Sequence, residues 1–335
     1  MKKMFVLASV MIMLGVSLFA LTSCSFGGKI SNLVNSKLEE KTTTVSEKFN
    51  SISIDTKVAD VELVPTDGEV KVVSYDHKKV SYDVKVENGE LKIEISDSRR
   101  WYERIFNFGY SSKLTVYLPE SHYGMLAIDQ STGDVDIPNN FTFDNVDISL
   151  STGDVSLMAS VLGNVKIDGS TGDVDVTNVT LGSLEIDIST GDVCISGLTC
   201  TSDVKIGVST GDIDLAGVTC QNMTLNLSTG DTELSSVRCN NLSSKANTGN
   251  IEMDNVIASE CFNIERTTGK VIFDHCDAGE IYVDTNSGSV KGSLLSEKVF
   301  ITKTSSGKID VPETITGGKC KITTSSGDIK IEIKN

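Results

Sequence analysis

Basic residues are scarce in this chain. Its 335 residues include 30 lysines and arginines against 46 aspartates and glutamates, so the formal net charge is -16. A protein that binds nucleic acid is expected to present a basic face to the phosphates. The composition therefore excludes nucleic acid as a partner.

Residues that commonly carry catalysis or hold metals are also few. The chain has three histidines and eight cysteines, and no two cysteines form the C-x-x-C pair typical of a zinc site. His77, His122 and His275 lie near no serine or cysteine motif that repeats a known nucleophile arrangement. We therefore predict a protein that is not an enzyme and needs no cofactor.

Proline is rare, with four residues, whereas glycine is plentiful, with 28. Eleven of these glycines follow one another at intervals of 19 or 20 residues, often within the motif STGDV. Apolar residues alternate around each of them, as Leu184, Ile186 and Ile188 do before Gly191. Alternation indicates strands with one buried face. The eleven glycines are Gly133, Gly153, Gly172, Gly191, Gly211, Gly230, Gly249, Gly269, Gly288, Gly307 and Gly327.

A unit of this length with two short strands cannot bury its apolar face alone, but stacked copies can. We therefore predict an all-β fold, a parallel β-solenoid (β-helix) of about eleven rungs of 19–20 residues over residues 119–335. The glycine is expected at a corner that requires a positive φ.

The beginning of the chain reads as an export signal. Lys2 and Lys3 precede an apolar run from Met4 to Leu21, and the sequence LTSC ends at Cys24. This ending resembles the bacterial lipoprotein signal. We expect residues 1–23 to be a signal peptide and Cys24 to carry the lipid that anchors the protein to the membrane of the bacterial cell envelope. A plain signal peptide and an uncleaved anchor helix are the alternatives.

Two further segments precede the repeats. Residues 24–47 are polar, and we expect a tether, with a short helix over Leu33 to Lys41 as an option. Residues 48–118 contain strand-like runs without the 19-residue period, and we expect an N-terminal β cap region over the open end of the rod. Within it, Asn88-Gly89 predicts the turn of a hairpin.

Stacking places one aspartate of each STGD turn in a file along the rod. One hypothesis is a row of calcium ligands, because calcium prefers oxygen donors. The other is that each carboxylate bonds to the amides of its own turn and is otherwise solvated, and we favour it because the calcium-binding repeat G-G-x-G-x-D is absent. No metal site is predicted, and calcium is the weak alternative. The file consists of Asp134, Asp154, Asp173, Asp192, Asp212 and Asp231.

Seven cysteines besides Cys24 cannot all pair within one chain. Cys200, Cys220 and Cys239 each follow a turn glycine by nine residues, an offset at which Leu162 and Leu181 stand in earlier rungs. We expect this file to point inward as free thiols that pack like small apolar groups. A disulfide between neighbouring rungs is the alternative.

Five of the 19 aromatic residues fall between residues 101 and 110. Trp101, Tyr102, Phe106 and Phe108 are candidates for contact with a partner or a membrane. A flap that covers core at the first rung is the alternative, and we favour it.

Several stretches of the chain resemble one known family. They are SISIDTKVADVELVP at residues 51–65, NGELKIEIS at 88–96, LTVYLPE at 114–120 and the run of STGDV turns. Over residues 48–335 the chain resembles the bacterial "putative adhesin" domain of unknown function with β-strand repeats. The resemblance implies a β-solenoid at the cell surface, and it supplies no catalytic or binding residues.

We therefore expect a lipid-anchored envelope protein that acts by surface interaction, as an adhesin does, on an unknown surface glycan or protein. The alternative is a regulatory module that senses envelope stress and binds a partner in the same envelope.

Overall fold

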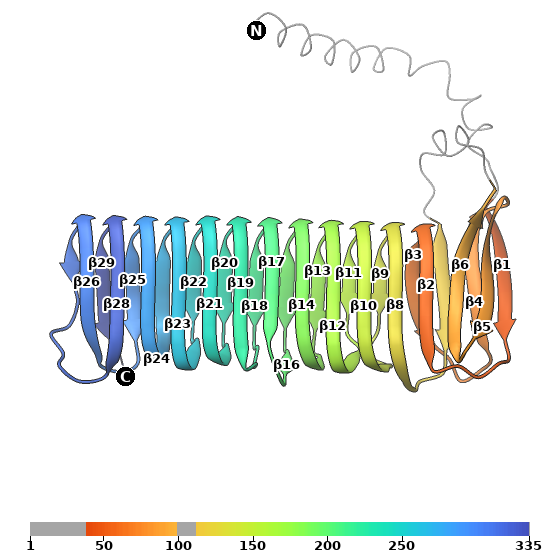
Figure 1. Cartoon of the computed structure of the whole chain (residues 1–335), viewed down its shortest axis with the longest axis horizontal. Coiled ribbons are helices and arrows are strands. Elements are labelled where there is room, and N and C mark those ends of the chain that lie inside the picture. The colour runs from red at the N-terminus through yellow and green to blue at the C-terminus, as the bar shows by residue number, and fades with distance from the viewer. Residues whose placement is uncertain (1–37, 99–111, 335) are drawn as a thin grey trace, which may run out of the picture.

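The structure, a computed structural model, describes residues 38–98 and 112–334. They form a straight, flattened rod of stacked rungs (Figure 1). Neighbouring rungs pair in parallel through two sheets, and the apolar side chains lie between the sheets. The predicted all-β parallel solenoid is therefore confirmed. The described residues include no helix long and apolar enough to cross a membrane.

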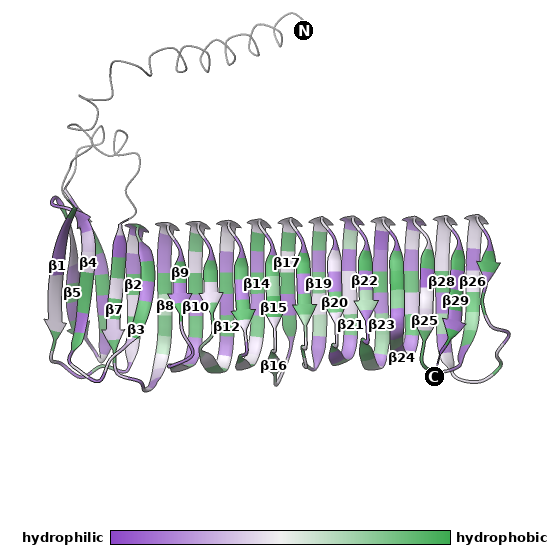
Figure 2. Ribbon diagram, turned by 180° about the vertical axis from the view of Figure 1, so that it is seen from behind, coloured by the Kyte–Doolittle hydropathy of each residue, from purple (hydrophilic) through white to green (hydrophobic). Residues whose placement is uncertain are grey.

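One rung shows how the sequence produces this shape. Along β14 (Thr180–Thr190), Ile186 and Ile188 are buried while Asp187 between them is exposed. The chain turns at Gly191, and in β15 (Val193–Ser196) the alternation continues with Val193 buried. A second bend then returns the chain to the first sheet. Figure 2 shows this alternation as purple and green bands along the strands.

The strands before the glycine corner form the long-strand sheet. Its members are β2 (Ser51–Val58), β5 (Val80–Glu87), β6 (Glu90–Asp97), β8 (His122–Thr132), β10 (Thr142–Thr152), β12 (Ser160–Thr171), β14, β16 (Thr199–Cys200), β17 (Val204–Thr210), β19 (Asn222–Thr229), β21 (Arg238–Thr248), β23 (Ile257–Thr268), β26 (Lys298–Ser306) and β28 (Gly318–Ser326).

The strands after the corner form the short-strand sheet, and β24 (Val271–Ser287) runs through both sheets. The other members are β1 (Leu38–Val45), β3 (Asp60–Pro65), β4 (Val70–His77), β7 (Lys113–Leu118), β9 (Val135–Ile137), β11 (Val155–Leu157), β13 (Val174–Thr177), β15, β18 (Ile213–Ala216), β20 (Thr232–Ser235), β22 (Ile251–Asp254), β25 (Val290–Leu294), β27 (Ile309–Asp310) and β29 (Ile329–Ile333).

The order of rungs in space departs from the order in sequence at both ends of the rod. At the C-terminal end, β28 lies between β24 and β26, because Cys320 pairs with Ile281 on one side and with Phe300 on the other. The Gly307 rung is therefore outermost, although the Gly327 rung follows it in the sequence. At the other end, β2 likewise lies between β6 and β8.

The N-terminal region contributes rungs as well as antiparallel strands. Within the range predicted as an N-terminal β cap region, β2–β3 and β6–β7 stack in parallel on the repeats. β4 pairs antiparallel with β7, and β5 with β6. The predicted hairpin is confirmed, with φ of 52° at Asn88 and 81° at Gly89.

The tether is shorter than expected. Leu38–Val45 forms β1, which pairs antiparallel with β4, so no helix extends to Lys41. This strand could not be predicted from the sequence, because its residues LEEKTTTV do not alternate between apolar and polar. The predicted signal peptide and Cys24 lie outside the described residues.

Leu162 is an exception among the residues expected to point inward. It is 64% exposed, because Val161 takes the inward place and pairs in register with Leu181. The bend before Val161 is one residue shorter than in the following rungs, so the offset from the glycine gave the wrong residue.

Candidate functional site

The glycine corner is held by backbone contacts that leave no room for a side chain. Gly191 has φ of 140°, and a Cβ atom there would lie 2.0 Å from the carbonyl oxygen of Gly172 in the preceding rung. Its amide donates a hydrogen bond to the carbonyl of Thr210 in the next rung, at 3.0 Å. Both the backbone angle and the stacking distance therefore require glycine.

The aspartate after each glycine bonds to the next rung. The amide of Asp192 donates to Oδ1 of Asp173 at 2.8 Å, and the amide of Asp212 donates to Oδ1 of Asp192 at 2.8 Å. The same bond joins Asp134 to Asp154, Asp154 to Asp173 and Asp212 to Asp231. The expectation that each carboxylate bonds within its own turn is wrong, since the partner is the equivalent amide one rung further on.

This ladder explains why like charges follow one another along the rod. One oxygen of each carboxylate accepts from a backbone amide, which offsets part of the repulsion, and water screens the remainder at an exposed corner. Asn250 continues the ladder as an acceptor for the amide of Lys270 at 2.9 Å. Because a neutral amide serves as well as a carboxylate, the position needs an oxygen acceptor and has no need of charge.

The six aspartates do not converge on a common point. Among the described residues, one group of three ligand atoms lies within 4.8 Å of one another, and it consists of Asp254, Asp274 and His275, all exposed. None of the six calcium candidates belongs to it. An exposed acidic cluster of this kind is not by itself a metal site.

A second corner lies six residues after six of the turn glycines; the sequence predicts a second bend in each rung but does not assign its residue. In five neighbouring rungs its φ lies between 53° and 67°, and in the sixth it is 50°, the left-handed helical region. Asparagine and glycine adopt this region most readily, yet serine and histidine also occupy it here. The six residues are Asn178, Gly197, Gly217, Ser236, Asn255 and His275.

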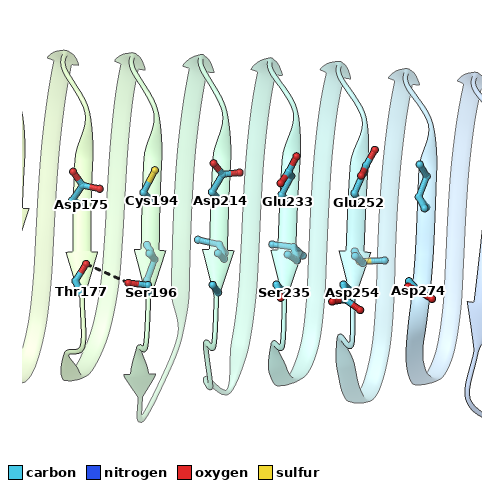
Figure 3. Close-up of a pocket in the computed structure, with 16 residues that line it drawn as sticks. Asp175, Thr177, Cys194, Ser196, Asp214, Glu233, Ser235, Glu252, Asp254 and Asp274 are labelled. Carbon is cyan, nitrogen blue, oxygen red and sulfur yellow. Dashed lines mark hydrogen bonds between the residues drawn. The ribbon is translucent and has the colours of Figure 1, made fainter.

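The outer face of the short-strand sheet carries a row of acidic side chains. Asp214, Glu233 and Glu252 pair in register on β18, β20 and β22 and are all exposed. Figure 3 shows them side by side with Asp175 and Cys194 on the preceding strands. Since neighbouring strands lie about 4.8 Å apart, the row presents carboxylates at nearly regular intervals.

The row borders a shallow groove of about 550 Å³, which Asp254 and Asp274 also line. Burial and the neighbouring carboxylates of Asp212 and Asp192 raise the pKa of Asp214. At its C-terminal end the row changes sign, because Lys291 and Lys330 occupy the equivalent positions on β25 and β29. The acidic stretch is thus bounded along the rod.

The cysteines pack as expected. All seven described cysteines are free, and Cys200, Cys220 and Cys239 are buried in one file. Burial raises the pKa of Cys239 and of Cys320 to about 12, which suppresses the reactive thiolate. Cys194 and Cys261 are half-buried.

The remaining candidates are scattered. His122 Nε2 lies 2.7 Å from Asp144 Oδ1, and His275 Nδ1 lies 2.8 Å from Asp274 Oδ1, on separate rungs. The serine contact of His275 is made by its backbone amide, which donates a hydrogen bond to Ser293 Oγ at 2.9 Å. Trp101, Tyr102, Phe106 and Phe108 lie outside the described residues.

Comparison with known proteins identifies a family. The family model described as Toastrack DUF4097 matches residues 49–235 and 201–335. This confirms the resemblance to a domain of unknown function with strand repeats. No curated protein matches the chain.

Solved structures with similar folds include proteins from Parabacteroides and Bacteroides species. A "putative adhesin" from Parabacteroides distasonis is 17% identical, with a TM-score of 0.45, over 77% of this chain and 98% of that one. A "putative lipid binding protein" from the same species is 16% identical, with a TM-score of 0.44, over 78% and 98%. A "putative adhesin" from Bacteroides fragilis is 16% identical, with a TM-score of 0.36, over 89% and 97%. At these values the likenesses carry no argument about function.

Proposed function

The chain belongs to the Toastrack DUF4097 family, and we propose that it is a non-enzymatic envelope protein, anchored by lipid at Cys24, that interacts with other surfaces through the acidic face of its short-strand sheet. The observation that carries this proposal is the in-register row of Asp214, Glu233 and Glu252. The partner is a glycan or protein whose positive charges repeat along an extended chain.

A row of this kind favours a repetitive partner over a single ion. Each exposed charge pair contributes only about 0.2–1 kcal/mol. Several pairs formed at once by two matched, rigid arrays add through multivalency. The corner ladders supply the rigidity, because they hold every rung in register with the next.

The lipid at Cys24 would hold the rod at the surface of the membrane, so that its acidic face can meet a partner outside. The described chain begins with Leu38 at one end of the rod, which leaves residues 25–37 as the tether from Cys24. A Cys24→Ala variant is expected to move the protein from the membrane fraction to the soluble fraction of cells. If the unaltered chain takes up no more labelled fatty acid than the Cys24→Ala variant, the lipid anchor is wrong.

The binding face is tested by a capture assay in which the chain that starts at residue 25 is immobilised. The immobilised protein is incubated with extract of its own bacterial envelope and with a panel of foreign glycans and basic proteins, and the bound material is measured. The face variant Asp214→Asn/Glu233→Gln/Glu252→Gln is compared with Asp129→Asn/Asp147→Asn/Asp187→Asn on the long-strand sheet, which removes the same charge.

We expect the face variant to weaken capture of foreign material about tenfold, from three lost charge pairs, and the control variant to leave it unchanged. Equal losses in both variants would show that net charge alone attracts the ligand. Capture of a protein of its own envelope, unaffected by the face variant, would favour the regulatory alternative. If capture of any ligand requires calcium, that result would support the aspartate ladder as a metal site.

A further inference from the structure

The rung built from β26 and β27 forms the tip of the rod, at the end opposite β1 (Figure 1). β26 pairs with β28 and β27 with β29, and among the described residues neither has a second strand partner. The hydroxyl of Thr314 bonds the carbonyl of Lys298 at one end of β26. The tip therefore presents two strand edges whose backbone groups can pair with another chain.

The tip also exposes apolar side chains, one at a position that other rungs bury and others on its outer face and in its loop. Ile309 continues the core file of Val290 and Ile329, yet it is 46% exposed because no rung follows it. Ile301 on β26 is 50% exposed, and Ile315 in the adjoining loop is 93% exposed. With Val299, the tip holds four of the seven exposed large apolar residues of the described chain.

Charge at the tip differs from charge on the remainder of the rod. Residues 295–317 contain three lysines (298, 303 and 308) and three acidic residues (297, 310 and 313), so this segment is neutral in a chain of net charge -16. Two copies of the acidic flank repel each other, whereas two tips do not.

The opposite end of the rod has a different construction. β5 of the long-strand sheet contacts β1 and β4 of the short-strand sheet across the end of the core. Its edge carries charge, since Lys85 forms ion pairs with Asp83, Glu87 and Glu94. Charged side chains on an edge strand oppose strand addition, so a tip cannot continue onto this end of another copy.

We propose that the tip binds the tip of a second copy of this chain about a twofold axis, with β26 and β27 each pairing antiparallel with their counterparts. Such an interface uses the same patch on both copies and closes at two. Charge supports this arrangement: in a β27 pair centred on Ile309, Lys308 lies opposite Asp310 of the second copy, and this contact occurs twice.

The composition of the tip suits reversible association. Thr302 and Thr304 occupy inward positions in β26 that are taken by Ile322 and Thr324 in β28. A surface that mixes apolar and polar groups is typical of partners that fold separately before they bind. If the anchor of the proposed function holds, the two membranes lie at opposite ends of the paired rods, so the contact joins two separate surfaces.

The test is the mass of the chain that starts at residue 25, measured by sedimentation over a range of concentrations. A monomer–dimer equilibrium is expected. Ile301→Lys is expected to raise the dimer dissociation constant about tenfold or more. Leu162→Lys, at an exposed leucine in the middle of the rod, is the matched control and should leave the constant unchanged.

A charge exchange tests the pairing itself, and its readout does not depend on a loss of folding. Lys308→Asp and Asp310→Lys should each weaken the dimer, and the double variant should restore it. A monomer at every concentration would overturn the proposal, as would assemblies that grow beyond two. A dimer that Ile301→Lys and the charge variants leave unaltered would also overturn it. None of these results decides the binding face on the short-strand sheet, which is tested separately above.

Discussion

Each rung turns at two corners, and the two place opposite demands on the sequence. At the glycine corner the backbone takes φ near 140° and lies against the carbonyl of the preceding glycine, so the residue cannot change. At the second corner φ is near 50–67°, and a Cβ atom added at Gly217 would meet nothing closer than 3.7 Å. Repetition in this sequence therefore marks the corner where backbones touch, and variation marks the corner where they do not.

The largest effect is expected from Gly191→Ala. The new Cβ would lie 2.0 Å from a backbone oxygen that the stacked sheet holds in place, and the backbone angle is unfavourable for alanine. We expect a loss of about 3–5 kcal/mol in the free energy of unfolding, measured by denaturant titration. A loss below 1 kcal/mol would show that the rungs can separate at this corner, and the stated contrast would fail.

A smaller effect is expected from the ladder beside that glycine. Asp192→Ala removes the acceptor for the amide of Asp212, and we expect a cost of about 1 kcal/mol, because water can partly replace the bond at an exposed corner. Asp192→Asn keeps the oxygen and should cost less than about 0.5 kcal/mol. If asparagine costs as much as alanine, the charge and not the hydrogen bond holds the ladder.

The smallest effect is expected at the second corner. Gly217→Asn should change the free energy of unfolding by less than about 0.5 kcal/mol, since asparagine enters the left-handed region readily. The matched variant Gly217→Val should cost about 1–2 kcal/mol, because a β-branched residue does not. Both free energies of unfolding are measured by denaturant titration. If the two variants are equally stable, the corner does not require a left-handed backbone angle.

These contrasts also explain which parts of the fold could be predicted from the sequence. The glycine corner, the inward files and the hairpin at Asn88-Gly89 follow from local rules that repeat. The second corner could be found only in part as a motif, because Gly197, Ser236 and His275 share a backbone angle and no chemical property. A search for asparagine or glycine six residues after each turn glycine would have found four of its six positions.

The order of rungs at the tip could not be predicted for a different reason. Gly288, Gly307 and Gly327 keep the same spacing whichever rung is outermost, so the period contains no information about order. The alternation predicts an outward direction for the residues of the acidic row, which are Asp214, Glu233 and Glu252. The STGD aspartates form a more regular acidic pattern, and they indicated the corner rather than the face of the sheet. What identifies the row is its in-register pairing on three strands, which requires the register of the sheet.

The most direct test of the whole account is a disulfide across the rungs of the tip. In the structure Ile281 pairs in register with Cys320, and strands at this spacing of about 4.8 Å can be bridged. Ile281→Cys, oxidised and mapped by peptide mass, is predicted to bond to Cys320. The contradicting result is no such bond, together with a bond between residues 281 and 300 in Ile281→Cys/Phe300→Cys/Cys320→Ala. That result would place the rungs in sequence order and remove β26 from the tip.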